Sequence, residues 1–376
     1  MRTVALVCLL IINLNAVAQY KVRFVINKFP PYHRKSDTVY LAGNFNGWNP
    51  HDSKLILTNG GIAIELKRGM YEYKFTRGSW DEVESGNEGF PIENHLVHIE
   101  SDTTFITEVN HWADHFPKKP KESTACRNVQ ILDTAFYMPQ LARHRRVWIY
   151  LPESYAASKK KYPVLYMQDG QNVFDNATAA YGEWGVDEAL DTLCKKKPEV
   201  IVVAVDHGTE KRITEYSPFD SPEHGKGEGD AYVDFLAHTL MPYINRHYRT
   251  KKNAKYTSVA GSSMGGLISL YAMLKYPDKF GSAGVFSPAF WMAPGLKDYV
   301  AKRAPKVKGR IYFYAGGQES ERMVPDMLQV FEALNAHSKA ELKTHIRAEG
   351  RHTESIWRDE FPLFYDWLHS PSSQNE

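Results

Sequence analysis

The stretch that decides the fold is Lys255–Leu274, KYTSVAGSSMGGLISLYAML. An apolar run rich in strand-favouring residues leads into Gly261, and a helical pattern begins at Met264. Between them, GSSMG matches the frame Gly-x-Ser-x-Gly with Ser263 at its centre and Ser262 at the variable position. Such a sharp strand-to-helix turn presents a serine hydroxyl as a nucleophile, and it needs small neighbours. A glycine- and serine-rich helix start is the alternative.

Apolar strands and amphipathic helices alternate on both sides of this stretch. The expected strands are RVWIYLP, PVLYM, VIVVAVD, YTSVAGS, SAGVFSP, GRIYFYAGG and ELKTHIRAE. Helical segments such as WGVDEALDTLC, YVDFLAHTLMPYINRHY (residues 232–248) and MVPDMLQVFEALNAH separate them. Continuous apolar strands with intervening helices are typical of a mostly parallel sheet covered on both faces. With the serine turn, the pattern predicts an α/β-hydrolase fold over residues 124–370, followed by a tail at 371–376.

The part of the chain before this region reads differently. Residues 19–114 contain short alternating runs such as YKVRFVI, TVYLAG, IAIELK and YEYKFT, punctuated by Gly, Asn, Asp and Pro. Short alternating strands with turn signals predict a small all-β sandwich. The following HFPKKPKES, residues 115–123, is rich in Pro and Lys and is interpreted as a linker.

The first 18 residues have the layout of a secretory signal. A basic Arg2 precedes an apolar run, and Ala16 and Ala18 form a small-x-small ending, which predicts cleavage after Ala18 and export to the periplasm or beyond the cell. An uncleaved anchor is the alternative. Cys126 and Cys194 remain in the mature chain, and their spacing decides neither a disulfide nor free thiols.

Charge and hydropathy exclude some classes of protein. The formal net charge is +2, with Lys and Arg scattered along the chain, so no nucleic-acid partner is expected. No later stretch approaches the ~20 apolar residues of a membrane-spanning helix.

A serine nucleophile needs a histidine base, and in this fold the chain order is Ser, acid, His. Of the 15 histidines, His337, His345, His352 and His369 follow Ser263. The first ends a helical segment, the second lies within a strand-like run and the last belongs to the tail. His352, in EGRHTESIW, follows a strand and precedes a helix, where catalytic groups gather, so it is the expected base.

The acid should follow the strand GRIYFYAGG. Glu319, Glu321 and Asp326 are the candidates, and Glu319 is preferred because it is nearest to the end of the strand. No metal or organic cofactor is implied by this chemistry.

The oxyanion hole needs two backbone N–H groups. Met264, directly after the nucleophile, would supply one, and Gly170 or Gln171 in the turn after PVLYM would supply the other. Asp169 in the same turn is interpreted as a turn-forming residue and not as a calcium ligand, because the residue spacing of a calcium-binding loop is absent.

With these residues in place, the region from Thr124 to His369 resembles the esterase D family, which includes enterochelin esterases, feruloyl esterases and mycolyltransferases. The likeness lies in VWIYLPESY, PVLYMQDGQNVFD, SVAGSSMGG, VFSPAFW, YAGGQES and GRHTESIW. The resemblance implies an exported serine esterase with a Ser263–His352–Glu319 triad. It does not determine the substrate, which could be an ester of a carbohydrate or a siderophore trilactone. A further alternative is a glycan-binding protein that keeps this scaffold and catalyses no reaction.

The N-terminal region has a likeness of its own. VYLAGNFNGWNP and RGMYEYKFTRGSWDEVE resemble the early-set β-sandwich of starch- and glycogen-binding modules, in which exposed tryptophans stack on sugars. This makes Trp48 and Trp80 candidates for glycan binding, with packing of the sandwich as the alternative. It also favours an acyl or hydroxycinnamoyl ester of a polysaccharide as substrate. In the second region Trp184, Arg212 and Trp291 are candidates for contact with the substrate, and Arg212 is the cation that could serve if the substrate were an anionic siderophore.

Overall fold

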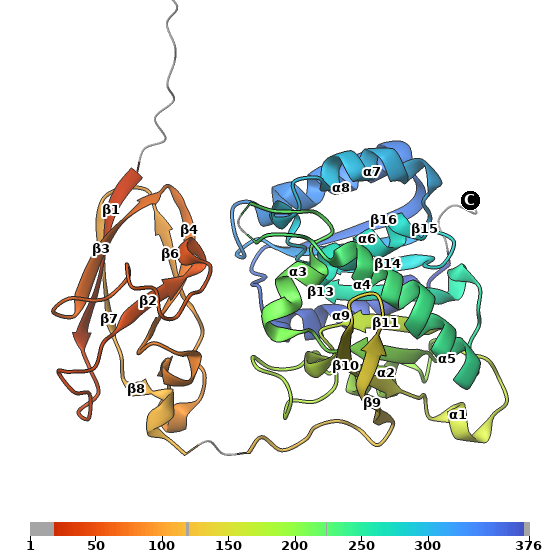
Figure 1. Ribbon diagram of the computed structural model, residues 1–376, viewed down its shortest axis with the longest axis horizontal. Helices are drawn as coiled ribbons and strands as arrows, with labels where there is room; N and C mark the ends of the chain where they lie inside the picture. The colour runs from red at the N-terminus through yellow and green to blue at the C-terminus, as the bar shows by residue number, and fades with distance from the viewer. Residues whose placement is uncertain (1–18, 118–119, 223, 372–376) are drawn as a thin grey trace, which may run out of the picture. The chain divides into compact units, whose positions relative to one another are not determined.

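The computed structural model describes residues 19–117, 120–222 and 224–371. These residues fall into two compact units, one ending before Pro120 and one beginning there (Figure 1). The predicted signal segment 1–18 and most of the predicted tail lie outside the described residues. None of the described helices is long and apolar enough to cross a membrane.

The first unit is built from short strands around one apolar core. Its strands are β1 (Gln19–Lys28), β2 (Tyr40–Gly43), β3 (Gly61–Lys67), β4 (Gly69–Thr76), β5 (Glu84–Ser85), β6 (His95–Ile99), β7 (Thr103–Glu108) and β8 (His111–Trp112). They form sheets of order β3-β1-β7 and β2-β4-β6 and a small β5-β8 pair. Side chains of both three-stranded sheets, among them Phe24 and Phe75, share the core.

The second unit is a large mixed sheet in the order β16-β15-β14-β13-β11-β12-β10-β9. Its strands are β9 (Val129–Met138), β10 (Arg143–Tyr150), β11 (Val164–Gln168), β12 (Ile201–Val205), β13 (Thr257–Ser262), β14 (Ser282–Phe286), β15 (Lys308–Gly316) and β16 (Lys339–Arg347). The strands from β11 to β16 pair in parallel, whereas β10 pairs antiparallel with both β12 and β9. The predicted α/β-hydrolase fold is therefore confirmed.

Helices cover both faces of this sheet (Figure 1). They are α1 (Ser154–Ala157), α2 (Val186–Leu193), α3 (Arg212–Tyr216), α4 (Gly229–Phe235), α5 (Met241–His247), α6 (Met264–Lys275), α7 (Leu296–Arg303), α8 (Met323–His337) and α9 (Glu354–Leu368). Apolar side chains of α2 and α9 belong to one core, and those of α4 to α8 belong to another. The two cores lie on opposite faces because successive side chains of a strand alternate between faces.

The chain reverses its direction of winding between β11 and β13. From β11 it passes to β12 on one side, and it then returns to β13 on the other side of β11. In open α/β sheets, ligand sites lie beyond the carboxyl ends of the strands at such a switch point. The turn after β11 and the Ser263 turn after β13 both lie at this edge.

One predicted helix is interrupted. The segment 232–248 is divided into α4, a π turn at Leu236–Leu240, and α5, in which Pro242 occupies the first turn. Proline lacks an N–H and its ring crowds the carbonyl four residues earlier, which explains why the helix widens just before it.

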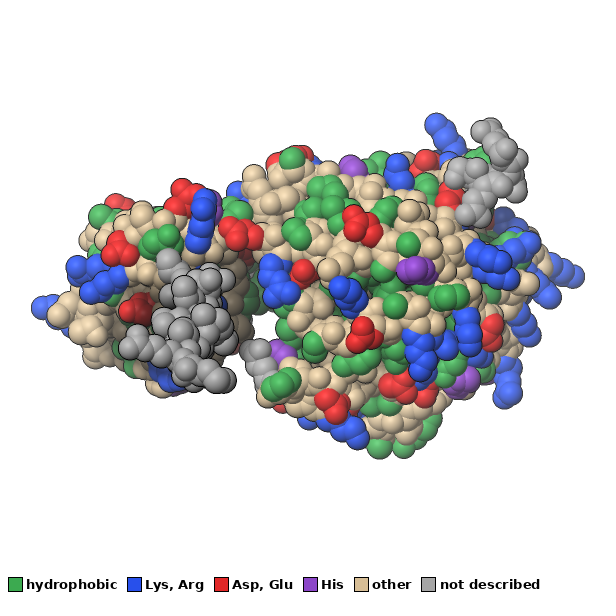
Figure 2. Space-filling model, turned by 90° about the horizontal axis from the view of Figure 1, so that it is seen from above, with side chains coloured by type: hydrophobic (Ala, Val, Ile, Leu, Met, Phe, Trp, Pro, Cys, Tyr) green, Lys and Arg blue, Asp and Glu red, His purple; other side chains and the backbone are tan. Residues whose placement is uncertain are grey.

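Acidic and basic side chains lie interspersed across much of the face seen in Figure 2. Cys126 and Cys194 are free thiols, each partly buried. Burial raises the pKa of the Cys126 thiol to about 12 and raises that of Cys194 as well.

Candidate active site

Ser263 occupies the turn between β13 and α6 in a backbone conformation that non-glycine residues rarely adopt, with φ 57° and ψ −122°. Such strain costs roughly 1–3 kcal/mol and needs support from its surroundings. The Ser263 N–H donates to the Phe286 carbonyl at 2.9 Å, and its own carbonyl accepts from Leu267 N and Ala289 N, each at 3.1 Å. Three neighbouring segments therefore hold the serine in place.

The small residues of GSSMGG are explained by close packing at this turn. A Cβ on Gly261 would stand 2.8 Å from the backbone of Gly265 and 2.9 Å from Gln168 Cγ, so a side chain there is excluded. Ser262 is the last residue of β13 and is 5% exposed, whereas Ser263 is only partly buried. The two adjacent serines thus occupy different environments, and Ser263 alone takes the strained position.

Glu319 and His352 meet at the carboxyl edge of the sheet. Glu319 follows β15, and His352 lies in the loop between β16 and α9. His352 Nδ1 donates to Glu319 Oε2 at 2.6 Å. The carboxylate is nearly inaccessible to solvent, with 1% of its side chain exposed against 29% for the histidine. A buried carboxylate at this distance fixes the Nδ1–H tautomer of the imidazole and leaves Nε2 able to accept a proton.

Two residues that the sequence analysis did not single out, Ser287 and Trp357, support the Glu319 carboxylate. Ser287 Oγ donates to Glu319 Oε1 at 2.7 Å, and Trp357 Nε1 donates to Ser287 Oγ at 2.8 Å. The Gly316 N–H donates to the same Oε1 at 2.6 Å. The Trp357 ring also packs edge-on against the His352 ring, with centroids 4.9 Å apart. Trp357 therefore contacts the histidine directly and reaches the carboxylate through Ser287.

The other candidates for base and acid lie elsewhere. His345 Nδ1 is paired with Glu360, at 2.7 Å from Oε1, and His337 is the exposed last residue of α8. His369 follows α9, and its burial, together with nearby cations, lowers its pKa to about 4. Glu321 is exposed, and Asp326 pairs with Arg322 on α8 at 3.1 Å.

The turn after β11, which the sequence analysis expects to supply an oxyanion-hole amide, begins with a left-handed residue. Asp169 has φ 57° and ψ 49°, and a 3-10 turn, Gly170–Asn172, follows it. A Cβ on Gly170 would stand 2.9 to 3.0 Å from the backbone of Ala204–Asp206, so only glycine fits. Met264 is the first residue of α6, and its N–H therefore has no acceptor within the helix.

Asp169 and Arg212 tie this turn to α3. Arg212 donates to both carboxylate oxygens of Asp169, from Nε at 2.7 Å and from Nη2 at 2.9 Å. The Asp169 N–H donates to Tyr216 Oη at 3.2 Å, and Oδ2 lies 3.0 Å from where a Cβ on Gly265 would stand. The charge of Asp169 favours the cation and raises the pKa of Arg212, although burial opposes this. The pair thus links α3, the β11 turn and the first turn of α6.

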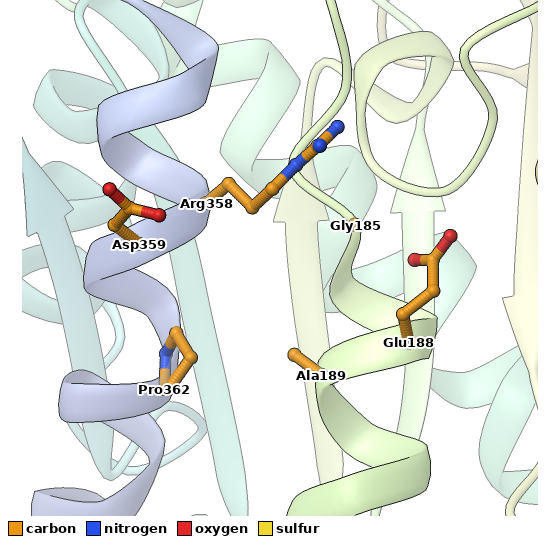
Figure 3. A pocket seen from close by; sticks show the side chains of 6 residues that line it. All are labelled: Gly185, Glu188, Ala189, Arg358, Asp359 and Pro362. Carbon is orange, nitrogen blue, oxygen red and sulfur yellow. The ribbon is translucent and has the colours of Figure 1, made fainter.

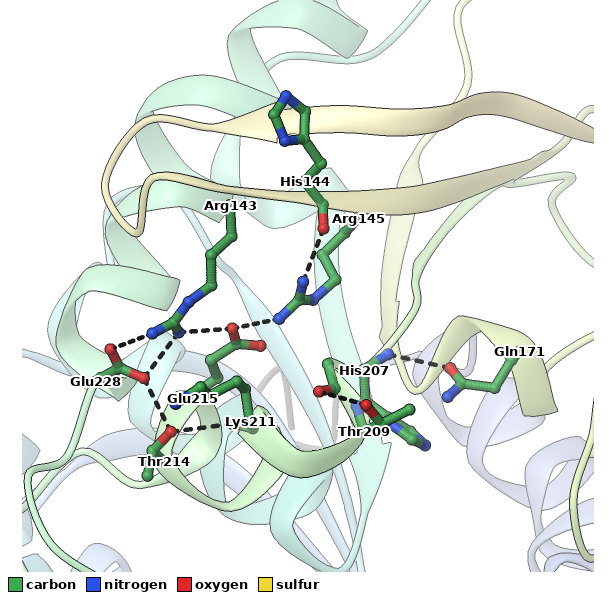
Figure 4. A network of polar contacts seen from close by, with 11 residues as sticks. Arg143, His144, Arg145, Gln171, His207, Thr209, Lys211, Thr214, Glu215 and Glu228 are labelled. Carbon is green, nitrogen blue, oxygen red and sulfur yellow. Dashed lines mark hydrogen bonds and ion pairs between the residues drawn. The ribbon is translucent and has the colours of Figure 1, made fainter.

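A second network fixes α3 itself (Figure 4). Arg143 on β10 donates to Glu215 at 2.8 Å and to both oxygens of Glu228, at 2.7 and 2.8 Å, and Arg145 also donates to Glu215. In the same view, Gln171 Oε1 accepts the backbone N–H of His207 at 3.0 Å. Side-chain contacts therefore hold the β11 turn at Asp169 and at Gln171.

The predicted substrate contacts lie in three different settings. Trp184 is 4% exposed and packs against Phe286 and Trp357, with centroids 4.9 and 5.8 Å away, so we treat it as a core residue. Trp291 is 38% exposed, two residues beyond Ala289, whose N–H bonds to the Ser263 carbonyl. The guanidinium of Arg212 is engaged with Asp169.

Trp48 and Trp80 are neighbours in the first unit. Trp48 follows the β2 segment with φ 59°, and Trp80 begins a 3-10 turn after β4. Their ring centroids are 6.1 Å apart at an interplanar angle of 50°, and both are partly exposed. Two partly exposed indoles side by side offer an aromatic surface.

In chemical terms, a serine on a strained turn and a histidine with a buried carboxylate partner are groups that acyl transfer by a serine triad requires. Among the described residues, no group of His, Cys, Asp and Glu could hold a metal ion.

Two proteins illustrate what this chain is similar to in sequence. The uncharacterized protein YbbA of Bacillus subtilis (strain 168) is 24% identical over 245 residues, covering 61% of this chain and 94% of that protein. An endo-1,4-beta-xylanase/feruloyl esterase of Xylanibacter ruminicola is 26% identical over 210 residues, covering 54% of this chain but only 27% of that protein.

A solved structure and a family model extend the likeness. The enterobactin esterase FES of Shigella flexneri superimposes with a TM-score of 0.54 at 17% identity, covering 92% of each chain, and thus shares the fold. The family model described as "Esterase: Putative esterase" matches residues 139–363, which include Ser263, Glu319 and His352. The chain therefore belongs to this esterase family and is a carboxylic ester hydrolase.

Proposed function

We propose that the protein is an exported serine esterase in which Ser263, His352 and Glu319 form the catalytic triad. The observation that carries the assignment is the 2.6 Å bond between His352 Nδ1 and the buried Glu319 carboxylate, both of which follow Ser263 in the chain order of this fold. Export rests on the signal-like first 18 residues, and N-terminal sequencing of the secreted protein should begin at Gln19.

In the first half of the reaction, Ser263 Oγ attacks the ester carbonyl while His352 Nε2 takes the hydroxyl proton. Glu319 holds Nδ1–H and stabilises the imidazolium. The N–H groups of Met264 and of Gly170 or Gln171 donate to the tetrahedral oxyanion. The imidazolium then protonates the leaving alcohol, and water, activated by the same histidine, releases the acid from Ser263.

For the substrate we propose an acyl or hydroxycinnamoyl ester of a carbohydrate. Support comes from the paired tryptophans of the first unit and from the relative described as a xylanase/feruloyl esterase. A siderophore lactone is the second candidate, because the likeness to the enterobactin esterase covers 92% of both chains. Against it, Arg212, the cation suggested for an anionic ligand, is already engaged by Asp169 through two bonds.

The test is hydrolysis of p-nitrophenyl acetate, methyl ferulate and a catecholate trilactone by the purified full chain. We expect turnover of the first two and little of the third. Turnover of the trilactone alone would replace the carbohydrate ester with the siderophore, and failure on all three would leave a binding protein on a hydrolase scaffold.

The oxyanion hole gives a prediction for Arg212. Arg212→Met keeps much of the apolar stem but removes both bonds to Asp169, so the β11 turn loses the contact that holds its left-handed residue. We expect kcat for methyl ferulate to fall by about 10²-fold, the scale of losing one oxyanion donor. Arg310→Met is the matched control, because Arg310 near the start of β15 pairs with Glu341 at 2.9 Å, at the opposite edge of the sheet from this turn. Equal losses in both variants would refute the positioning role.

The first unit gives a prediction for its tryptophans. Trp48→Ala combined with Trp80→Ala removes the aromatic pair, and we expect retention of the full chain on insoluble starch or xylan to fall at least tenfold. Phe90→Ala is the control, since Phe90 is 63% exposed in the same unit. If wild type and both variants are retained equally, the tryptophans serve only to pack the sandwich.

A further inference from the structure

A polar pocket opens beside the His352 loop. Its volume is about 350 Å³, and it is lined by Thr124, Asn176, Tyr181, Gly182, Glu183, Ser355 and Arg358. This is near the lower end of ligand pockets, which measure ~300–1,000 Å³. Ser355 follows His352 by three residues, in the first turn of α9.

Glu354 connects this pocket to the proposed catalytic centre. Its Oε1 accepts from Asn172 Nδ2 in the β11 turn at 3.5 Å, and its Cβ lies 4.0 Å from where a Cβ on Gly182 would stand. Burial raises the pKa of Glu354, while the charges of His352 and Arg212 lower it. The same residue thus adjoins the pocket wall, the oxyanion turn and the histidine.

Tyr181 gives the pocket an aromatic wall. At 70% exposure it is the most exposed large hydrophobic side chain among the described residues. Ligand pockets combine aromatic side chains with a small number of placed polar groups. Apart from this ring the side chains of the lining are almost entirely polar. An acyl chain would find little apolar surface there, whereas a sugar could place its C–H face on the ring and its hydroxyls on the polar groups.

The wall that carries Tyr181 is held in place by buried carboxylates. Asp175 accepts from Ser123 Oγ at 2.9 Å and from Thr124 N at 3.2 Å. Glu183 accepts from Thr124 Oγ1 at 2.7 Å. Asp175 and Glu183 are 7% and 4% exposed. The end of the predicted linker is therefore bonded into the wall, and a pre-ordered wall reduces the entropic cost of binding.

Arg358 also lines a second pocket along α9, which Figure 3 shows. Its guanidinium donates to the Glu183 carbonyl from Nε at 3.0 Å and from Nη2 at 2.8 Å, yet the side chain remains 48% exposed. The second pocket has about 590 Å³, lies between α2 and α9, and includes Glu188 and Asp359. Because Arg358 lines both pockets, they adjoin along α9, and we call the two together the α9 groove.

We propose that this groove is the subsite for the alcohol side of the ester, with one sugar ring stacked on Tyr181 and the next units of an oligosaccharide running past Arg358 along α9. This inference rests on the proposed function and deepens it, because it assigns the carbohydrate leaving group to a site on the protein and names Tyr181 as its contact. The substrate class is then an ester on a hydroxyl of a short neutral glycan, rather than an ester of a simple alcohol.

The test compares two esters with the same acid, methyl ferulate and a feruloylated arabinoxylo-oligosaccharide. In the full chain, Tyr181→Ala should lower the ratio of kcat/KM for the sugar ester over the methyl ester about tenfold, mainly through KM, and Tyr181→Phe should preserve the ratio because it keeps the ring. Tyr137→Ala is the matched control, since Tyr137 is 51% exposed on β9 of the same unit. An unchanged ratio in Tyr181→Ala would overturn the proposal.

A binding arm separates failure of the subsite from failure of the esterase assignment. Xylotetraose is titrated, by NMR, into the full chain carrying Ser263→Ala, Trp48→Ala and Trp80→Ala, which removes the other candidate sugar surface. We expect binding in the millimolar range that Tyr181→Ala weakens about tenfold. If xylotetraose binds equally well with and without Tyr181→Ala, or does not bind at all, the subsite is refuted even if the protein proves to be an esterase. Tyr181-dependent binding without turnover supports the subsite and contradicts the proposed reaction.

Discussion

Ser263→Ala should abolish ester hydrolysis, with kcat falling on the order of 10⁶-fold, the scale seen when the nucleophile of a serine triad is removed. The substituted residue keeps the Cβ and the backbone bonds to Phe286, Leu267 and Ala289, so the turn should persist. The measurement is the rate of methyl ferulate hydrolysis, with thermal unfolding as the check that the variant is folded.

Ser262→Ala is the matched control because it removes the same atom one residue earlier. Ser262 is a buried strand residue and Ser263 takes the strained position, so we expect Ser262→Ala to retain most of the activity. Comparable losses in both variants would undo the choice of Ser263 as nucleophile, and loss in Ser262→Ala alone would transfer the role to Ser262.

The alternation of apolar strands and amphipathic helices was sufficient to predict the fold of the second unit. It failed where exposure hides the apolar pattern. Strand β9 went unnoticed because most of its residues are exposed at the edge of the sheet. The segment 232–248 read as one helix because its apolar spacing persists through the π turn that Pro242 imposes.

The candidate site was predictable to the extent that it follows chain order. Ser263, Glu319 and His352 were each inferred from a position after a strand, and the structure places the last two in hydrogen-bonding contact. Ser287 and Trp357 could not be inferred, because Ser287 bonds to a carboxylate 32 residues away and Trp357 bonds to Ser287, 70 residues away. Trp184 was predicted to contact the substrate, but its ring is packed in the core.

Glu319→Gln should lower kcat by about 10⁴-fold, as when a triad acid becomes an amide and the histidine takes the wrong tautomer. The neighbours determine how the amide is oriented. Ser287 Oγ–H and Gly316 N–H both donate to the Oε1 position, at 2.7 and 2.6 Å, so the amide oxygen should remain there. Its NH₂ group then faces His352 Nδ1, which must accept, and Nε2 keeps its proton and cannot act as the base.

A second buried carboxylate provides the control for this argument. Glu360 accepts from Tyr312 Oη at 2.5 Å and pairs with His345 Nδ1 at 2.7 Å, so it matches Glu319 in burial and in having a histidine partner. Glu360→Gln should cost about 1–3 kcal/mol of stability through its unsatisfied buried partner, while kcat should stay near that of the wild type. If Glu321→Gln or Asp326→Asn loses activity while Glu319→Gln remains active, the catalytic acid is Glu321 or Asp326 and not Glu319. Equal loss in Glu319→Gln and Glu360→Gln would mean that buried carboxylates here maintain the sheet rather than orient the histidine.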